Sequence, residues 1–371
     1  MMNVKIQPAS AASPTYRIWT TLDLITWTRS YFEKKGIEHA RLEAELLLAE
    51  VLGCARIRLY VDFEKPVGAE QLARFREYVK RRGETREPLQ YILGHTQFLD
   101  LKIKVTPAAL IPRPETEILA VWAVERALEM SAAVSATACL SRSAGEGNVA
   151  AGTAASETPS KTTIEEQPPL VFRPRTKVPK STGAGVSVLE LCTGSGCIAL
   201  YMASKLSEAH IVATDISKEA LDLARENATA LKLDARVEFL NGDLFGALSN
   251  AGGPPAPQNA GCPPAPQLFD LIVANPPYVD EASKPALQPE VRDFEPPAAL
   301  YGGSDGTSII RRILNESAAW LKPGGYLGLE FGAGQAERIL QIAQATKLFI
   351  DLKIESDAAK LPRFLLARTK A

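Results

Sequence analysis

The sequence predicts an α/β protein in which a mostly parallel sheet carries helices on both faces. Two observations lead to this fold class. Apolar runs of strand length alternate with segments of helical periodicity, and this alternation is typical of a parallel sheet covered by helices. The two last apolar runs have no helix between them, so they predict an antiparallel pair at the sheet edge. The predicted strands are residues 186–191, 210–215, 237–240, 269–274, 326–331, 349–354 and 363–368.

The first hundred residues differ from the rest. Residues 17–82 have helical periodicity, with Leu22, Ile25 and Trp27 in one segment, and Gly36 and Gly53 stand at the segment ends. We expect a small all-α domain of four or five helices. Alternating apolar residues over 97–105 predict a short β-hairpin after it. A helix should then run from about Glu115 to Met130. The prolines at its start do not argue against it, because proline is well tolerated in the first turn of a helix.

Two segments depart from both periodicities. Residues 131–184 are dominated by Ala, Ser, Thr, Gly and Pro, and 249–267 contain a near-repeat of Pro-Pro-Ala-Pro-Gln. Such segments bury too little apolar area to offset the entropy of ordering, so we interpret both as disordered insertions. The expected layout is therefore a flexible N-terminus (1–15), a helical domain (16–95), a β-hairpin linker (96–110) and an α/β domain (111–371) that contains both insertions.

Composition excludes several classes of protein. The 371 residues carry 42 Lys and Arg against 43 Asp and Glu, a net charge of −1, which gives no general excess for binding nucleic-acid phosphates. No apolar stretch is long enough to span a membrane, and no signal segment is evident. Five cysteines without C-x-x-C spacing predict reduced thiols in a cytoplasm. Only three histidines occur, on different elements, so we expect no metal site.

Three predicted strands end in residues that suit a nucleotide-type ligand. The first leads into Glu190-Leu191-Cys192-Thr193-Gly194-Ser195-Gly196 and a helix over 198–206. Glycines there allow a ligand to approach the backbone, although the spacing matches neither G-x-G-x-x-G nor a P-loop. The second strand ends at Asp215, where ribose hydroxyls are usually held. The third leads to Asn241-Gly242-Asp243-Leu244, where an adenine edge could rest.

Each of these acidic residues also has a purely structural interpretation. Asp215 could cap a helix over 217–227, and Asp243 could belong to a solvated turn. Glu190 could bond to backbone amides of the glycine turn without touching a ligand. Arg113 and Glu117 could be surface charges, and Lys80-Arg81-Arg82 a solvated helix face or a surface for an acidic partner.

A stiff turn follows the predicted strand 269–274, with the sequence Asn275-Pro276-Pro277-Tyr278. Prolines have a fixed φ and no N–H, so the carbonyl groups of the turn are held in place. The Asn275 side-chain oxygen and a backbone carbonyl could both accept from one planar NH2 group, and Tyr278 could cover its flat face. This arrangement suits an amide or adenine nitrogen presented to an electrophilic carbon, although such a turn can also be just a loop.

Taken together, these motifs resemble those of S-adenosylmethionine-dependent methyltransferases with a seven-stranded Rossmann-like sheet. A wider match, from roughly Trp19 to Arg368, resembles the peptide-chain release factor glutamine N5-methyltransferases. It rests on Phe98 and on residues 88–94 (Pro-Leu-Gln-Tyr-Ile-Leu-Gly), 111–117 (Ile-Pro-Arg-Pro-Glu-Thr-Glu), 294–296 (Phe-Glu-Pro) and 299–306 (Ala-Leu-Tyr-Gly-Gly-Ser-Asp-Gly). Cys192 departs from the pattern, because the family usually has glycine at the head of the turn. If that position needs a positive φ, cysteine costs of order 1 kcal/mol there.

The resemblance implies an enzyme that transfers a methyl group from S-adenosylmethionine to the glutamine of the Gly-Gly-Gln loop of class-I release factors. The helical domain would dock the factor. The expected catalytic residues are Asn275, Pro276 and Tyr278, and Pro277 joins them in binding the substrate. The expected cofactor pocket consists of Glu190, Cys192, Thr193, Gly194, Ser195, Gly196, Asp215, Asp243, Leu244 and Asn275.

Two other classes stay open on the sequence. An adenine-N6 methyltransferase shares the Asn-Pro-Pro-Tyr turn, but it would be expected to carry a basic groove and a target-recognition domain. A catalytically silent binding module could use the same α/β domain for assembly. Against that, a lapsed site has no physical reason to keep Gly194, Gly196, Asp215 and Asn275 together.

Overall fold

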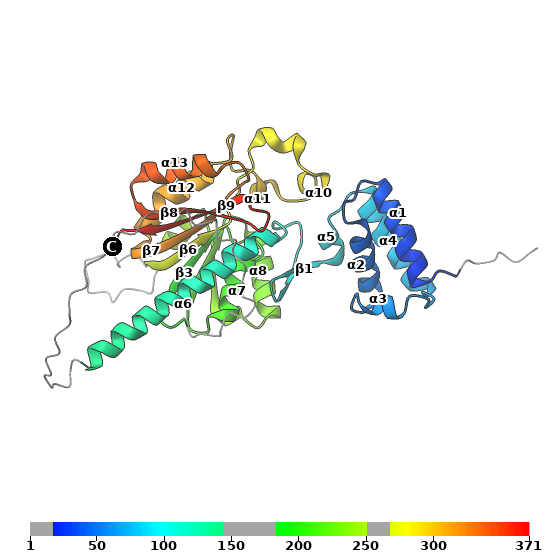
Figure 1. Ribbon diagram of the computed structural model, residues 1–371, viewed down its shortest axis with the longest axis horizontal. Coiled ribbons are helices and arrows are strands. Elements are labelled where there is room, and N and C mark those ends of the chain that lie inside the picture. Colours follow the sequence, from blue (N-terminus) through cyan, green and yellow to red (C-terminus); the bar gives the residue numbers. More distant parts are fainter. Residues whose placement is uncertain (1–17, 144–182, 251–267, 371) are drawn as a thin grey trace, which may run out of the picture. The chain divides into compact units, whose positions relative to one another are not determined.

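The structure, a computed structural model, describes residues 18–143, 183–250 and 268–370. The chain divides between Leu93 and Gly94 into a helical unit and an α/β unit (Figure 1). The flexible N-terminus expected at 1–15 lies outside the described residues, as does most of each predicted insertion. Within the described part, no helix is both long and apolar enough to cross a membrane.

The helical unit confirms the all-α domain that the periodicity predicts. Thr20 and Asp23 form a capping box that starts the first helix. Phe32, Leu47 and Phe75 are almost completely buried between the helices and form the centre of the core. The helices are α1 (Thr21–Lys34), α2 (Ala40–Leu52), α3 (Arg58–Val61), α4 (Ala69–Glu84) and α5 (Leu89–Leu93).

Periodicity did not identify every buried residue in this unit. Ile25 is buried as expected, but Leu22 and Trp27 are each half exposed. Conversely, Arg82 does not lie on a solvated face. It is buried and forms a salt bridge with Glu43 of α2 at 2.5 Å, because a charge inside a core requires a partner of opposite sign.

The α/β unit contains a seven-stranded sheet with the order β5-β4-β3-β6-β7-β9-β8, which confirms the predicted Rossmann-like architecture. The five strands from β5 to β7 are parallel, and β9 runs antiparallel to both of its neighbours. The predicted antiparallel edge pair is therefore present. The strands are β3 (Ser187–Leu191), β4 (His210–Asp215), β5 (Val237–Asn241), β6 (Phe269–Ala274), β7 (Leu321–Glu330), β8 (Phe349–Ser356) and β9 (Pro362–Thr369).

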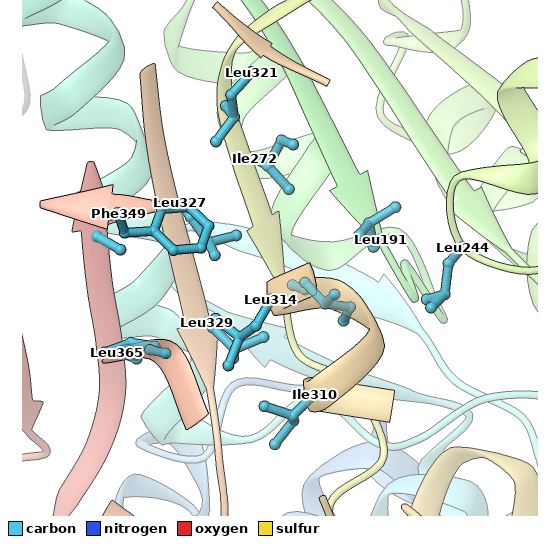
Figure 2. Packing of buried hydrophobic residues seen from close by; sticks show 14 of the residues in the cluster. Leu191, Leu244, Ile272, Ile310, Leu314, Leu321, Leu327, Leu329, Phe349 and Leu365 are labelled. Atoms are coloured by element: carbon cyan, nitrogen blue, oxygen red, sulfur yellow. The ribbon is translucent and has the colours of Figure 1, made fainter. Parts of the chain in front are cut away.

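Helices cover both faces of this sheet, with α6, α7 and α8 on one face and α12 and α13 on the other (Figure 1). Figure 2 shows part of the buried cluster on the second face, to which β6, β7, β9 and α12 all contribute apolar side chains. The long helices are α6 (Pro114–Ser143), α7 (Cys197–Lys205), α8 (Lys218–Ala230), α12 (Ser308–Glu316) and α13 (Ala336–Thr346). Short helical turns are η1 (Asp234–Arg236), α9 (Gly246–Asn250), η2 (Glu281–Ala286), α10 (Pro289–Arg292), α11 (Pro297–Leu300) and η3 (Ser317–Ala319).

Three predicted boundaries need correction. Helix α6 continues to Ser143 instead of ending at Met130, so the start of the first predicted insertion is helical, and α9 likewise takes in the start of the second. Alanine, a strong helix former, is abundant just after Met130. Strand β7 starts at Leu321, five residues before the predicted strand 326–331.

The predicted β-hairpin is present as β1 (His95–Phe98) and β2 (Leu101–Lys104). It belongs to the α/β unit, because the buried Asn227 of α8 binds both the backbone N–H and the carbonyl of Lys104, at 2.8 and 3.1 Å. The Asn227 side chain also donates to the Ser195 carbonyl in the glycine turn at 3.0 Å. One amide thus connects the hairpin, a helix and the turn.

We predict that Asn227→Ala lowers the free energy of unfolding by about 2–4 kcal/mol, because buried backbone groups lose their partners. Glu226→Gln is the matched control. Its carboxylate pairs with Lys104 Nζ at 2.7 Å at an exposed position, so its loss should cost less than about 1 kcal/mol. Urea denaturation followed by circular dichroism measures both. Equal stability of the two variants would contradict the bridging role of Asn227.

Candidate active site

The register of two central strands determines where the site lies. Strands β3 and β6 are parallel neighbours, and Leu191 pairs with Ala274. The glycine turn after β3 and the Asn-Pro-Pro-Tyr turn after β6 therefore leave the sheet side by side. The chain moves outward from β3 to β4 and β5 and returns at β6, so this edge is the switch point at which α/β sheets bind ligands.

Asp215 holds the glycine turn from the neighbouring strand. One carboxylate oxygen accepts from the Gly194 N–H at 2.8 Å and the other from the Ser217 N–H at 2.9 Å. The N-cap of α8 is Ser217, whose side chain accepts from Ala220, so the capping interpretation of Asp215 is wrong. Each carboxylate oxygen keeps a lone pair, so Asp215 can still accept from a ligand hydroxyl.

Glu190 supports the turn from beneath. Its carboxylate, only 1% exposed, accepts from Thr193 Oγ1 at 2.6 Å and from the Ala199 N–H at 3.0 Å. Burial raises the pKa of Glu190 to about 8, although these two hydrogen bonds act in the opposite direction. Glu190 therefore does accept hydrogen bonds at the glycine turn, as its structural interpretation predicts. Direct contact of Glu190 with a cofactor stays a prediction.

Cys192 has a φ of 58°, in the left-handed region that favours glycine. The sequence anticipated a strained cysteine here if the position required a positive φ, and it does. Burial raises the pKa of the thiol well above its usual range, with the Asp215 and Glu190 carboxylates adding to the effect. Cys192 is therefore a neutral wall residue and not a reactive thiolate.

Asp243 is not a simple solvated turn residue. Its two carboxylate oxygens accept from Arg312 of α12 at 3.0 and 3.1 Å, although the pair is about half exposed. Leu244, which follows it, has a φ of 49° and is buried. The geometry turns the chain sharply after β5 and keeps Asp243 at the rim.

A cavity of about 280 Å³ lies at this edge of the sheet. Residues expected in the cofactor pocket line it: Glu190, Cys192, Thr193, Gly194, Ser195, Asp215, Asp243, Leu244 and Asn275. Gly196 is not part of the lining. Its φ of 82° begins α7, and an added Cβ would meet Ala224 at 3.1 Å. Of the three acidic side chains in the lining, Asp243 is paired with Arg312 and burial raises the pKa of Glu190 to about 8, so Asp215 is the carboxylate left without a guanidinium partner for a ligand.

The Asn-Pro-Pro-Tyr turn contributes Asn275 and Pro277 to the cavity lining. Asn275 Nδ2 donates to Thr116 Oγ1 at 3.0 Å, and Tyr278 OH lies 3.5 Å from Glu330 Oε1. Pro276 is buried, and neither it nor Tyr278 belongs to the lining. The structure thus brings the four residues together but exposes only two of them to the cavity.

The segment 299–306 presses against the same turn. The N–H of Gly302 donates to the Val279 carbonyl, and a Cβ on Gly302 would lie 2.5 Å from the Pro277 carbonyl oxygen. Gln335 Nε2 donates to the Tyr278 carbonyl at 2.9 Å. The two prolines have no N–H, so the turn has few backbone donors of its own. Its position is therefore fixed by hydrogen bonds and close contacts from other segments.

Sequence reasoning missed several residues that hold the site. Arg113, which lines the cavity, is not a free surface charge, because it pairs at 2.5 Å with the buried Glu295. Glu117 accepts from the Leu99 N–H at 2.8 Å. Thr116 and Glu330 were not identified as site residues. Thr116 lay within the motif 111–117, but Glu330 stood in an apolar run without a pattern to mark it.

Residues 182–330 match the family model of a methyltransferase domain. With the seven-stranded sheet and the site at its switch point, this match makes the chain a methyltransferase of the Rossmann-like class. Residues 23–94 match the family model described as the PrmC N-terminal domain, which covers the helical unit.

Curated relatives define the family more closely. The release factor glutamine methyltransferase of Geobacter sulfurreducens is 38% identical over 89% of this chain and 90% of its own length. Those of Rhodopirellula baltica and Chlorobaculum tepidum are 35% and 32% identical, over 94% and 95% of this chain and 95% and 98% of their own lengths. The chain belongs to the release factor glutamine methyltransferases.

A pair of variants tests the strain at Cys192. Alanine is ordinarily the more stable choice, but at a positive φ glycine should be favoured. We expect Cys192→Gly to be more stable than Cys192→Ala by about 1 kcal/mol, since both lose the thiol and only alanine keeps a Cβ. Comparing the two variants by urea denaturation isolates the backbone term. A more stable alanine variant would show that the position carries no strain.

Proposed function

We propose that the cavity binds S-adenosylmethionine and that the chain methylates the side-chain amide N5 of a glutamine. The substrate would be the Gly-Gly-Gln loop of class-I peptide-chain release factors. Family membership supports this reaction, and so does a cavity at the switch point of the sheet that is lined by Asp215 and the glycine turn. The observation that carries the proposal is Asn275, which lines the cavity and whose side-chain nitrogen already donates to Thr116, so that its oxygen is left to accept from a ligand.

The residues of the chain fit the cofactor. The glycine turn allows close approach, Asp215 has lone pairs for the ribose hydroxyls, and Asp243 and Leu244 lie where the adenine would rest. S-adenosylmethionine supplies an electrophilic methyl group when bound. The protein therefore has no leaving group to activate, and its task is to hold the acceptor nitrogen.

An amide nitrogen is a poor nucleophile, because its lone pair is delocalised into the carbonyl. We propose that the side-chain oxygen of Asn275, which lines the cavity, and the carbonyl of the adjacent Pro276, which lies next to that lining, accept the two N–H bonds of the substrate amide. Tyr278 would pack against the amide plane and keep water away. Fixed orientation of this kind can contribute several kcal/mol to catalysis, about 7–11 at most. No general base is assigned, because the proton can leave after transfer.

The helical unit would dock the release factor, and the reaction would take place in the cytoplasm, where such factors act. A nucleic-acid substrate is the alternative that the Asn-Pro-Pro-Tyr turn leaves open. It is not favoured, because the relatives are named for release factor glutamine and the chain has a net charge of −1.

Tritiated S-adenosylmethionine distinguishes these substrates. The purified chain is incubated with a class-I release factor, with the same factor carrying alanine in place of the loop glutamine, and with duplex DNA. We expect label only in the unmodified factor. Label in DNA, or undiminished label in the glutamine-free factor, would refute the proposed reaction.

We predict that Asn275→Ala lowers kcat at least about 100-fold, because an oriented acceptor of the reacting amide is removed. Affinity for S-adenosylmethionine, measured by calorimetry, should change little. Asn315→Ala, at an exposed position on α12, is the matched control and should behave like the unaltered chain. Near-normal turnover of Asn275→Ala would mean that the turn does not hold the acceptor.

A further inference from the structure

A series of hydrogen bonds leads from Asn275 to two buried side chains, Thr116, which also lines the cavity, and Glu330. Asn275 Nδ2 donates to Thr116 Oγ1 at 3.0 Å, and Thr116 Oγ1 donates to Glu330 Oε2 at 2.8 Å. Thr116 and Glu330 are each 2% exposed. Three segments far apart in the sequence meet here, namely the start of α6, the turn after β6 and the end of β7.

The ionisation of Glu330 determines which groups donate and which accept in these hydrogen bonds. An ionised carboxylate only accepts hydrogen bonds, and a hydroxyl has a single hydrogen to donate. Thr116 must give that hydrogen to Glu330, so toward Asn275 it can act only as an acceptor. The NH2 end of the Asn275 amide therefore faces Thr116, and the oxygen is the end left for a ligand.

The surroundings of Glu330 shift the pKa of its carboxyl group toward neutral pH. Burial raises the pKa of Glu330 to about 7, and the nearby Glu115 carboxylate acts in the same direction. The hydrogen bonds from Thr116 and Tyr278 and the positive charge of Arg363 act against this rise. Arg363 is itself paired with Asp357 at 3.2 Å.

We propose that Thr116 and Glu330 are positioning residues that fix the amide of Asn275 with its oxygen toward the cavity. The ionised carboxylate sets the direction, and the hydroxyl transmits it. Protonation gives Glu330 a hydrogen to donate, and the fixed direction is lost. The catalytic consequence rests on the proposed function, because only an NH2 acceptor needs an oxygen at that position.

The orientation can be measured without any methyl acceptor. In full-length protein labelled with 15N-asparagine, the side-chain NH2 signal of Asn275 is assigned by its loss in Asn275→Ala. We expect this signal to titrate with an apparent pKa near 7, reporting Glu330. The titration should persist in Thr116→Ser, which keeps the hydroxyl, and vanish in Thr116→Val and Glu330→Gln. A signal that titrates equally in all four proteins, or in none, would overturn the proposal.

Turnover gives the second readout. At pH 8, Thr116→Val should lower kcat about 10-fold or more with little change in affinity for S-adenosylmethionine, and Thr116→Ser should restore most of it. In the unaltered chain kcat should fall as the pH drops through about 7, because the activity depends on the ionised form of Glu330. This acid limb should be absent in Glu330→Gln and Thr116→Val. If kcat of Glu330→Gln and of Thr116→Val falls at low pH just as it does in the unaltered protein, the positioning role is contradicted.

The two readouts separate this inference from the proposed function. If the Asn275 signal titrates but the protein does not label the release factor, the proposed substrate is refuted and the orienting role of Thr116 and Glu330 stands. If the release factor is labelled but the Asn275 signal does not titrate, the proposed substrate stands and the orienting role of Thr116 and Glu330 is refuted. Thr116→Ser and Glu330→Gln change size very little, and calorimetric binding of S-adenosylmethionine shows that each variant is folded.

Discussion

The parallel pairing of β3 with β6 is the constraint on which the site depends. Because Leu191 lies opposite Ala274, the residues that leave the two strands, Cys192 and Asn275, emerge at the same level of the sheet. A slip of one residue in this register would turn every side chain of β6 to the other face. Both strands are almost entirely buried, so a slip would also place apolar side chains wrongly.

This constraint explains why so many contacts reinforce the turn after β6. The strand can deliver Asn275 to the correct edge, but two prolines deprive the turn of backbone donors that would hold it. The missing support comes from Gln335 and from the close approach of Gly302. Segments that seemed unrelated in the sequence therefore serve one purpose, which is to immobilise a few atoms around the cavity.

Local patterns in the sequence predicted most of the fold. Alternating strands and helices gave the sheet, and glycine and proline marked the two turns. Boundaries were less accurate where propensity and tertiary packing compete, as at β7, which begins at Leu321, before the predicted strand 326–331, because Leu321 pairs with Phe269 of β6. Residues that adjoin in sequence were also predicted to lie at the edge of the sheet where the cavity is found. Asp215 was placed at the correct edge, but its two backbone partners depend on how α8 and the glycine turn meet.

Partners distant in the sequence could not be predicted in this way. Thr116 and Glu330 are 214 residues apart, and nothing local to either indicates that they touch. Glu330 looked like the polar end of an apolar strand, which is a common and uninformative pattern. Arg82 was misjudged for the same reason, since its partner Glu43 lies on another helix. Buried charge pairs of this kind become visible only when the packing is known.

The two buried glutamates of the site show why one of them suits a structural role and the other a functional one. Glu190 of β3 accepts from the Thr193 hydroxyl in the glycine turn and from the Ala199 N–H in α7, so its bonds hold the turn between the strand and the helix. Within the described residues, the carboxylate of Glu330 accepts from side chains, Thr116 and Tyr278, and Thr116 in turn accepts from Asn275. Burying a carboxylate without a backbone donor is unfavourable, and an apolar side chain would often be as stable there. The position of Glu330 is therefore better explained by the direction that it imposes on the Asn275 amide than by stability.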